Sequence, residues 1–455
     1  MADTNTLAAK PATKPAKKPR NYLIDVFKLI SAITVFLAHL PSMGIGVGDL
    51  TSDGSVVTES FLNAGSSYFY MTLGPYFGWL RGYITLSFYL FFLGYWFMNT
   101  FKSIQRKGYF GKGKDLKLIL RYFCKNYSAY WPPLIYGVIF GYLVYGIAFP
   151  QMFLQNPINI IHSFVNGIPE FLGIFEWVWS PNMWQTGWFA PFTNNLTDTS
   201  HVLLSFSAVY FLSMAIFALT VYFVIFTISE KFGATIWCFW MYTACCLTFG
   251  SSGGEGYYIF TGLGINYDFI RLMGPASLGI WGWYMADYLK KAVTTKKHQR
   301  NITLVAVLCY AVLGWWIVTG DGGMITTDIV GGTLFTIVMV EKDYITIAVN
   351  KFLNKLPFSK HISTMAMSIF LHHYPLVIMY GEMKQFLGGP DWLMSLSRDQ
   401  LTIYGLILLF LLGVVYIFID KYFVQRLSRW VSRITHAQDP VFTEEELAAI
   451  EASKG

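Results

Sequence analysis

The stretch RNYLIDVFKLISAITVFLAHL, residues 20–40, decides the fold class of this chain. Its apolar run is about as long as the hydrocarbon core of a bilayer requires, and it is continuous rather than alternating. A continuous run predicts a helix, because a helix satisfies its own backbone hydrogen bonds inside a membrane. Three ionisable side chains interrupt the run, namely Asp25, Lys28 and His39. Such groups are costly in a bilayer and are therefore candidates for function.

Nine further segments of similar character follow, so the sequence predicts an all-α polytopic membrane protein with about ten transmembrane helices. The composition agrees with this class, because 54% of the residues are hydrophobic and 13% are charged. The charged share is about half that of a usual soluble protein, which argues against a soluble enzyme, a disordered chain or a nucleic-acid-binding domain. The expected spans are roughly 22–40, 78–98, 131–149, 201–228, 233–250, 270–290, 301–319, 325–340, 361–381 and 400–422.

The positions of the basic residues predict how these spans are oriented. Of the 33 lysines and arginines, 28 fall on one side of a ten-span topology, so both termini are expected in the cytoplasm. The protein is then a multi-pass protein of the inner (plasma) membrane, and its first twenty residues lack the pattern of a signal peptide. We expect a disordered basic cytoplasmic tail at 1–20, a transmembrane domain at 21–425 with an outer loop at about 150–200, and a cytoplasmic C-terminal tail at 426–455.

Other features of the sequence bear on cofactors and on the tail. None of the five cysteines has C-x-x-C spacing, so we interpret them as core residues, not as disulfides or metal ligands. No metal and no permanently bound cofactor is expected. The segment TEEELAAIEA predicts a short acidic helix, capped by Thr443 with Glu446 three residues on. The basic cytoplasmic face would attract anionic lipid or a phosphorylated substrate.

Lys28 and His39 are expected to share one face of the first span. Eleven residues turn a helix by about 20° beyond three full turns and advance it by about 16 Å. Lys28 then lies near the cytoplasmic end, and His39 lies near the outer end, just before Pro41. The alternative interpretation is structural, with Asp25 and Lys28 as an interfacial pair at i, i+3 and His39 as a span-ending residue.

Further candidates lie later in the chain. His372 and His373 fall in the middle of the ninth span, and adjacent residues on a helix point about 100° apart, so only one faces a given cavity. A histidine bonded to a neighbouring helix is the alternative. Arg271 opens the sixth span at the outer side, where it either anchors an anionic group or snorkels to the interface. Glu176, in the outer loop, is a candidate general base or a solvated carboxylate.

These residues occur in an arrangement that resembles the membrane-bound acyltransferase family 3, over about residues 20–425. The family's first span carries Asp, a basic residue three positions on, and His fourteen positions after the Asp, and Asp25, Lys28 and His39 keep that spacing. Arg271 and His373 match its sixth-span arginine and its late His-x-Pro segment. Further similar stretches are FYLFFLGYWF, LILRYFCKNYSAYWPPLIY, NMWQTGWFAPF, IRLMGPASLGIWGW and SIFLHHYPL.

The sequence departs from the family's pattern at three positions. Leu93 replaces the serine of the second span. Asn126 and Ala129 occupy the places of arginines thought to hold the phosphates of the acyl donor. Arg121 and Lys125 lie close by in the sequence and suit the same role by their spacing. The resemblance therefore describes a divergent member, with an unusual donor or with its activity lost.

The resemblance implies transfer of an acyl group, with acetyl as the first expectation, from cytoplasmic acyl-CoA to a hydroxyl of an extracytoplasmic cell-envelope glycan. His39 would act as general base or as acyl carrier, with Asp25 as a second catalytic residue. Lys28, Arg121 and Lys125 would hold the donor phosphates, and the pantetheine arm would run between helices toward His39. The oxyanion or the acceptor would contact Arg271, His373, Trp184, Trp188 and Glu176. For the two tryptophans, an aromatic belt at the membrane surface is the alternative.

Two other functions fit the same features. A transporter or flippase of a polar or lipid-linked metabolite would also bury Asp, Lys and His, and it predicts transport without dependence on CoA. A non-catalytic scaffold of envelope assembly would tolerate the altered motif positions, and it predicts that replacement of His39 has no consequence. In each case the expected partners are the bilayer and envelope-biosynthesis proteins, and no nucleic acid.

Overall fold

Helices are the only regular secondary structure in the described part of the chain. No strand occurs in it, which confirms the all-α prediction for this part. Two helices carry stretches long and apolar enough to cross a membrane, Phe211–Ile228 and Gln400–Ile434. The arrangement of ten spans stays a prediction. The computed structural model describes residues 20–39, 83–148, 172, 206–250, 267–319, 324–382, 390–396 and 398–452.

The described part of each expected span lies in a helix, because each span is a long and mainly apolar run. These helices are α1 (Tyr22–His39), α4 (Tyr83–Arg106), α5 (Asp115–Ala148), α11 (Phe206–Ile228), α13 (Cys238–Gly250), α15 (Tyr267–Ala292), α16 (Lys296–Thr319), α17 (Met324–Val340), α19 (Ile362–Glu382) and α21 (Arg398–Ile419).

Shorter elements connect or extend these helices. They are α12 (Glu230–Phe232), the π-helix η2 (Gly233–Trp237), α18 (Tyr344–Leu353), the 3-10 helix η3 (Ser359–His361), α20 (Asp391–Met394), the π-helix η5 (Asp420–Val424), α22 (Gln425–Ile434) and α23 (Glu444–Ala452). The acidic helix predicted near the C-terminus is confirmed as α23. Its capping box also forms, because Glu446 N donates to Thr443 Oγ1 over 3.3 Å and Thr443 N donates to Glu446 Oε2 over 2.8 Å.

The helix that contains the third expected span is longer than the span itself. Helix α5 begins at Asp115, and Pro132 and Pro133 lie inside it. Proline has no N–H, so Pro132 cannot donate to the carbonyl of Ser128 one turn earlier. Ser428, from α22, supplies that bond instead, because its hydroxyl donates to Ser128 O over 2.7 Å. A partner 300 residues away along the chain thus takes over the bond that the proline cannot make.

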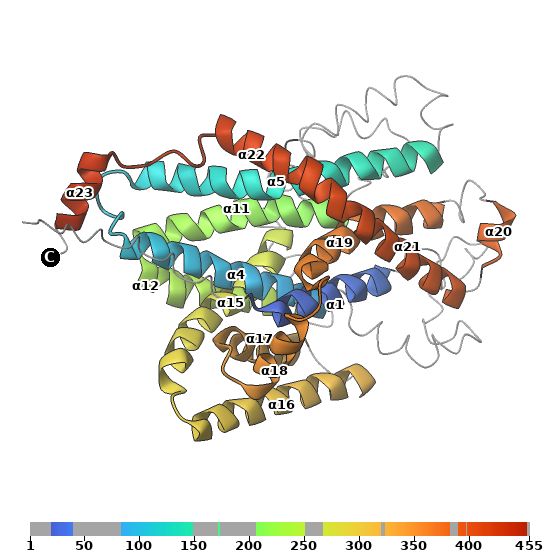
Figure 1. Cartoon of the computed structure of the whole chain (residues 1–455), viewed down its shortest axis with the longest axis horizontal. Coiled ribbons are helices and arrows are strands. Elements are labelled where there is room, and N and C mark those ends of the chain that lie inside the picture. The colour runs from blue at the N-terminus through green and yellow to red at the C-terminus, as the bar shows by residue number, and fades with distance from the viewer. Residues whose placement is uncertain are drawn as a thin grey trace, which may run out of the picture.

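The main core lies around α4, which packs against α15, α1 and α17 (Figure 1). The contact between α4 and α15 is unusually close. A Cβ on Gly94 would overlap the carbonyl oxygen of Ala276, and a Cβ on Gly279 would overlap that of Phe91. On its other side, α1 packs against α19, and α19 in turn packs against α21. This arrangement places α1, with its charged residues, between α4 and α19.

Candidate functional site

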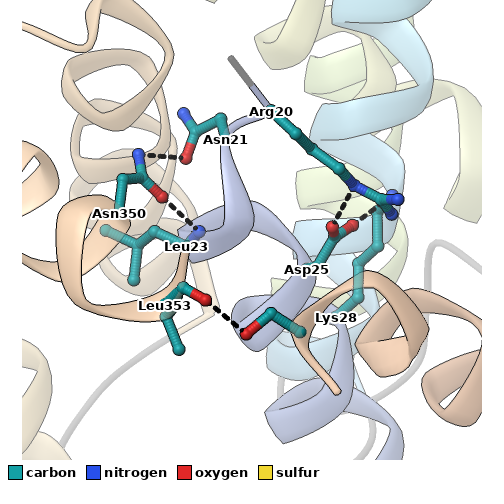
Figure 2. Close-up of polar contacts among 8 residues, drawn as sticks. Arg20, Asn21, Leu23, Asp25, Lys28, Asn350 and Leu353 are labelled. Carbon is teal, nitrogen blue, oxygen red and sulfur yellow. Dashed lines mark hydrogen bonds and ion pairs between the residues drawn. The ribbon is translucent and has the colours of Figure 1, made fainter. Parts of the chain in front are cut away.

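A buried charge cluster stands at the start of α1 (Figure 2). Arg20 Nε lies 2.7 Å from Asp25 Oδ2, and Lys28 Nζ lies 3.8 Å from Asp25 Oδ1. The Asp25 side chain is 5% exposed, whereas that of Arg20 is 47% exposed and that of Lys28 is 16% exposed. The i, i+3 pair of Asp25 and Lys28 is therefore present, and Arg20 is the nearer partner of the carboxylate. Asp25 serves here to neutralise and hold two cations.

The backbone that carries this cluster is fixed to two other helices. Asn350, in α18, accepts a 3.0 Å bond from Leu23 N and donates a 3.0 Å bond to Asn21 Oδ1. Asn21 Nδ2 donates to the Val338 carbonyl of α17 over 2.9 Å. These bonds occupy backbone and side-chain groups that a helix start leaves without intrahelical partners. They set the depth of α1, and hence the position of Lys28.

Lys28 also faces a column of aromatic rings on α4. Its ammonium lies 3.7 Å from the centroid of the Phe92 ring, and Phe92 stacks on Trp96 with centroids 5.8 Å apart. Tyr89 OH donates to the Lys28 carbonyl over 2.7 Å. A cation held over a ring face gains from the quadrupole of the ring, most strongly where water is excluded. The column leads from Lys28 toward the end of the bundle at which α23 lies.

At that end, Trp96 lines a cavity of about 460 Å³ between α4, α5 and the C-terminal tail. Arg121 and Lys125, both predicted to bind the donor, stand one turn apart on the α5 wall of this cavity. Lys107 and Asn99 line it from the α4 side. Neither Arg121 nor Lys125 makes an ion pair with any residue in the described ranges. The structure thus brings Lys28, Arg121 and Lys125 into one region through Trp96, although Lys28 itself does not line the cavity.

The last wall of the cavity is the tail segment that enters α23. Lys114 Nζ donates to Glu446 Oε2 over 2.6 Å, and Lys117 Nζ donates to the Val441 carbonyl over 3.2 Å. Phe442 packs on Tyr109 with ring centroids 4.8 Å apart. An ion pair, a hydrogen bond and an aromatic contact therefore hold this tail segment in place as a wall of the cavity.

The docking of the tail segment, residues 441–452, is expected to weaken in acid. The hydrogen bond from Lys114 holds the pKa of Glu446 below its ordinary 4.5. A carboxyl whose pKa is lower in the docked tail stabilises docking above its ordinary pKa, and that contribution is lost as pH falls through the lowered value. The protection factors of residues 441–452, corrected for the intrinsic pH dependence of amide exchange, should therefore stay constant from pH 7 down to the ordinary pKa of 4.5 and fall at lower pH.

The matched variants for this prediction lie on one helix. Glu446→Gln should lower the protection factors of the tail already at pH 7, because the neutral amide cannot form the ion pair with Lys114. Glu451→Gln, on the exposed side of α23, should behave like the wild type. Equal protection factors in all three proteins across the pH range would contradict docking of the tail through the ion pair of Lys114 and Glu446.

The paired histidines of α19 are both fully buried. His372 lies between α5 and its own helix, with Nε2 2.7 Å from Tyr136 OH and Nδ1 2.9 Å from Ser368 Oγ. His373 Nδ1 lies 2.8 Å from the Phe370 carbonyl, which can only accept, so this nitrogen carries the proton and Nε2 is the basic one. His372 is thus a histidine bonded to a neighbouring helix, which was the structural alternative for the pair. His373 stays the candidate of the pair for acid–base chemistry, through its basic Nε2.

Aromatic contacts join His373 to the cavity. Tyr89, bonded to the Lys28 carbonyl, packs on Phe370 with centroids 5.8 Å apart. Phe370 lies 6.0 Å from His373, again between centroids. The Lys28 side chain thus meets the ring pair of Phe92 and Trp96. The Lys28 backbone is connected to His373 through Tyr89 and Phe370.

The sequence interpretation missed Asp328, a buried ionisable residue. Asp328, in α17, is 1% exposed, and it is close enough to Cys245 to act on that thiol electrostatically. Arg271, predicted to bind the oxyanion or acceptor, is half-buried on α15 and acts on the same thiol. Asp328 and Arg271 therefore both lie within electrostatic range of Cys245. The signal was present, because an aspartate inside the apolar segment 325–340 meets the criterion that selected Asp25.

The other predicted site residues are placed only in part. His39 is the last residue of α1, and the position of its side chain lies outside the description. Trp184, Trp188 and Glu176 all fall outside the described residues. No family model, curated protein or solved structure matches the chain.

Proposed function

We propose that the protein is an integral membrane acyltransferase with about ten spans and a cytoplasmic donor site. It would move an acyl group, acetyl in the first instance, from acyl-CoA to a hydroxyl of an extracytoplasmic envelope glycan. The observation that carries the proposal is the cavity between α4, α5 and the tail, with Arg121 and Lys125 on one wall and Trp96 leading to Lys28. Two of the three residues selected by sequence for phosphate binding, Arg121 and Lys125, line this cavity.

The chemistry of the cavity suits the nucleotide end of the donor. Arg121, Lys125 and Lys107 supply three cations against the single carboxylate of Asp439. Guanidinium and ammonium groups bind phosphate oxygens through charge-assisted hydrogen bonds. Trp96, 56% exposed, offers a face on which a purine can stack. The volume of about 460 Å³ is in the range of small-molecule sites and takes the nucleotide, leaving the pantetheine arm to extend away.

The arm would then follow the aromatic column past Lys28 into the bundle. Acyl transfer breaks the thioester bond and forms an ester bond to the acceptor oxygen. A neutral imidazole takes the hydroxyl proton, and that proton leaves with the CoA thiolate as a thiol. His39, at the end of α1, is the proposed base. His373 is buried with Nδ1 protonated, and it is a second imidazole on the same route.

The test is binding of CoA and acetyl-CoA to the purified full-length protein, measured by calorimetry. Each charge-assisted bond to phosphate is worth roughly 1.5–3 kcal/mol, so Arg121→Ala with Lys125→Ala should weaken binding by about 100-fold or more. A matched double variant, Lys351→Ala with Lys355→Ala, removes two exposed cations of the α18 region and should leave affinity unchanged. A wild-type protein that binds neither compound, or equal affinity in both double variants, would overturn the proposal.

A further inference from the structure

A second large hollow lies on the far side of the molecule from the tail, between α15, α16 and α17. It is a groove of about 760 Å³. Its walls are mainly apolar, and Met285, Val305 and Ile329 line it with 53%, 43% and 52% of their surface exposed. His298 and Asn301 line the end nearest the loop between α15 and α16.

The groove exists because α16 does not close on α15. Helix α16 packs against α17 and α18, and Tyr344 N donates to Thr303 Oγ1 over 3.0 Å. Figure 1 shows α16 at the lower edge of the bundle, beneath α18. Gly282 and Gly332 line the groove from α15 and α17. In a membrane, an open space of this kind between helices has to be filled by lipid or by protein.

One end of the groove carries surplus positive charge. Lys296, Lys297 and Arg300 are exposed at the start of α16, and none of them makes an ion pair with another residue of the described part. The neighbouring Lys291 is neutralised by Asp287 at 2.7 Å. His298 Nδ1 donates to the Ala292 carbonyl over 2.9 Å, which leaves Nε2 as its second polar atom.

The other charges at this end are engaged with the protein. Lys290 donates to Tyr95 OH over 3.1 Å, and Lys342 donates to the Val293 carbonyl over 2.7 Å. Glu341 is the further carboxylate close to Lys290. The three cations at the start of α16 thus remain available to an anion. An apolar groove with a cationic end matches an amphiphile that has an anionic head and a long apolar tail.

We propose that this groove binds an anionic phospholipid, with one acyl chain along Met285, Val305 and Ile329. The phosphate would face His298 and the cations at the start of α16. This inference rests on the membrane location in the proposed function, and it does not depend on acyl transfer. Each basic residue near a membrane surface adds about 1 kcal/mol toward anionic lipid, so the head group determines selectivity and the groove determines retention.

The experiment is native mass spectrometry of the full chain released from nanodiscs that hold equal amounts of phosphatidylglycerol and phosphatidylcholine. Wild type should retain phosphatidylglycerol in preference to phosphatidylcholine. Thr333→Trp, which fills the groove, should reduce retention by about tenfold or more, whereas Leu308→Trp, exposed on α16 but outside the groove, should not. Replacing Lys296, Lys297 and Arg300 with glutamine should abolish the preference between the two lipids.

Two outcomes would overturn the inference. One is equal retention of the two phospholipids by the wild type, and the other is retention that Thr333→Trp leaves unchanged. Affinity for CoA is measured on the same preparations, so the two proposals can fail separately. Lipid selectivity without CoA binding removes the acyltransferase proposal alone. CoA binding without lipid selectivity removes the groove site alone.

Discussion

Replacing Asp25 with alanine is expected to lower the stability of the protein by about 2–4 kcal/mol. The carboxylate is buried and balances Arg20 and Lys28, so its removal leaves Lys28 as an uncompensated cation inside the bundle. The full loss for breaking a buried pair is reduced here because Arg20 is half exposed and can turn to water. The measurement is the midpoint of thermal unfolding in detergent, with binding of CoA as a second readout.

A second substitution distinguishes the cost of the unpaired Lys28 charge from the cost of lost packing around position 25. Asp25→Ala combined with Lys28→Met should recover much of the stability, because the pair is replaced by apolar groups. Asp287→Asn is the matched control, since its ion pair with Lys291 is solvent-exposed and worth at most about 0.5 kcal/mol. If the double variant is no more stable than Asp25→Ala, the charge on Lys28 is not what Asp25 balances.

The aromatic contacts beside Lys28 extend this result to function. Lys28 is held between Asp25 and the Phe92 ring, and Phe92 stacks on the Trp96 that lines the cavity. Asp25 contacts two cations of its own chain and so positions Lys28. The catalytic role that the sequence suggested for Asp25 stays a prediction. Donor affinity is expected to fall in Asp25→Ala and to stay low in the rescued double variant, which lacks the Lys28 ammonium.

Local spacing made part of this site predictable. The i, i+3 relation of Asp25 and Lys28 follows from helical geometry, and so does the placement of Arg121 and Lys125 one turn apart on one wall. The capping box of Thr443 and Glu446 is equally local. Each of these relations spans at most four residues of one helix, over which periodicity determines neighbours.

What could not be predicted depends on contacts between distant segments. Arg20 precedes the first helical turn, so periodicity says nothing of where its side chain points. The cavity is closed by the tail, and Lys114 pairs with a residue 332 positions further on. Tyr136 carries no charge that would single it out, yet it lies 2.7 Å from a ring nitrogen of His372. Such pairings are set by how the helices pack, which local periodicity does not determine.

Gly94→Ala is expected to cost about 3 kcal/mol or more in stability, although it adds one methyl group. That methyl would overlap the carbonyl oxygen of Ala276, and backbone cannot turn aside as a flexible side chain does. Helices α4 and α15 would have to separate, and the reciprocal contact of Gly279 with the Phe91 carbonyl would open with them. Because α4 also carries Phe92 and Trp96, the same shift should weaken donor binding. Thermal unfolding and CoA affinity measure the two effects.

Two alanine substitutions at other helical glycines distinguish overpacking from a general effect of replacing glycine. A Cβ on Gly314 meets nothing within 4 Å, and one on Gly331 meets ring atoms of Phe88 and Phe91 at 3.6 Å, an ordinary contact. Alanine is favoured over glycine inside helices by roughly 0.5–1 kcal/mol, so both variants should unfold at or slightly above the wild-type temperature. If Gly94→Ala unfolds at the same temperature as these two variants, α4 and α15 are not in backbone contact. Another contact would then have to fix the position of Trp96 in the bundle.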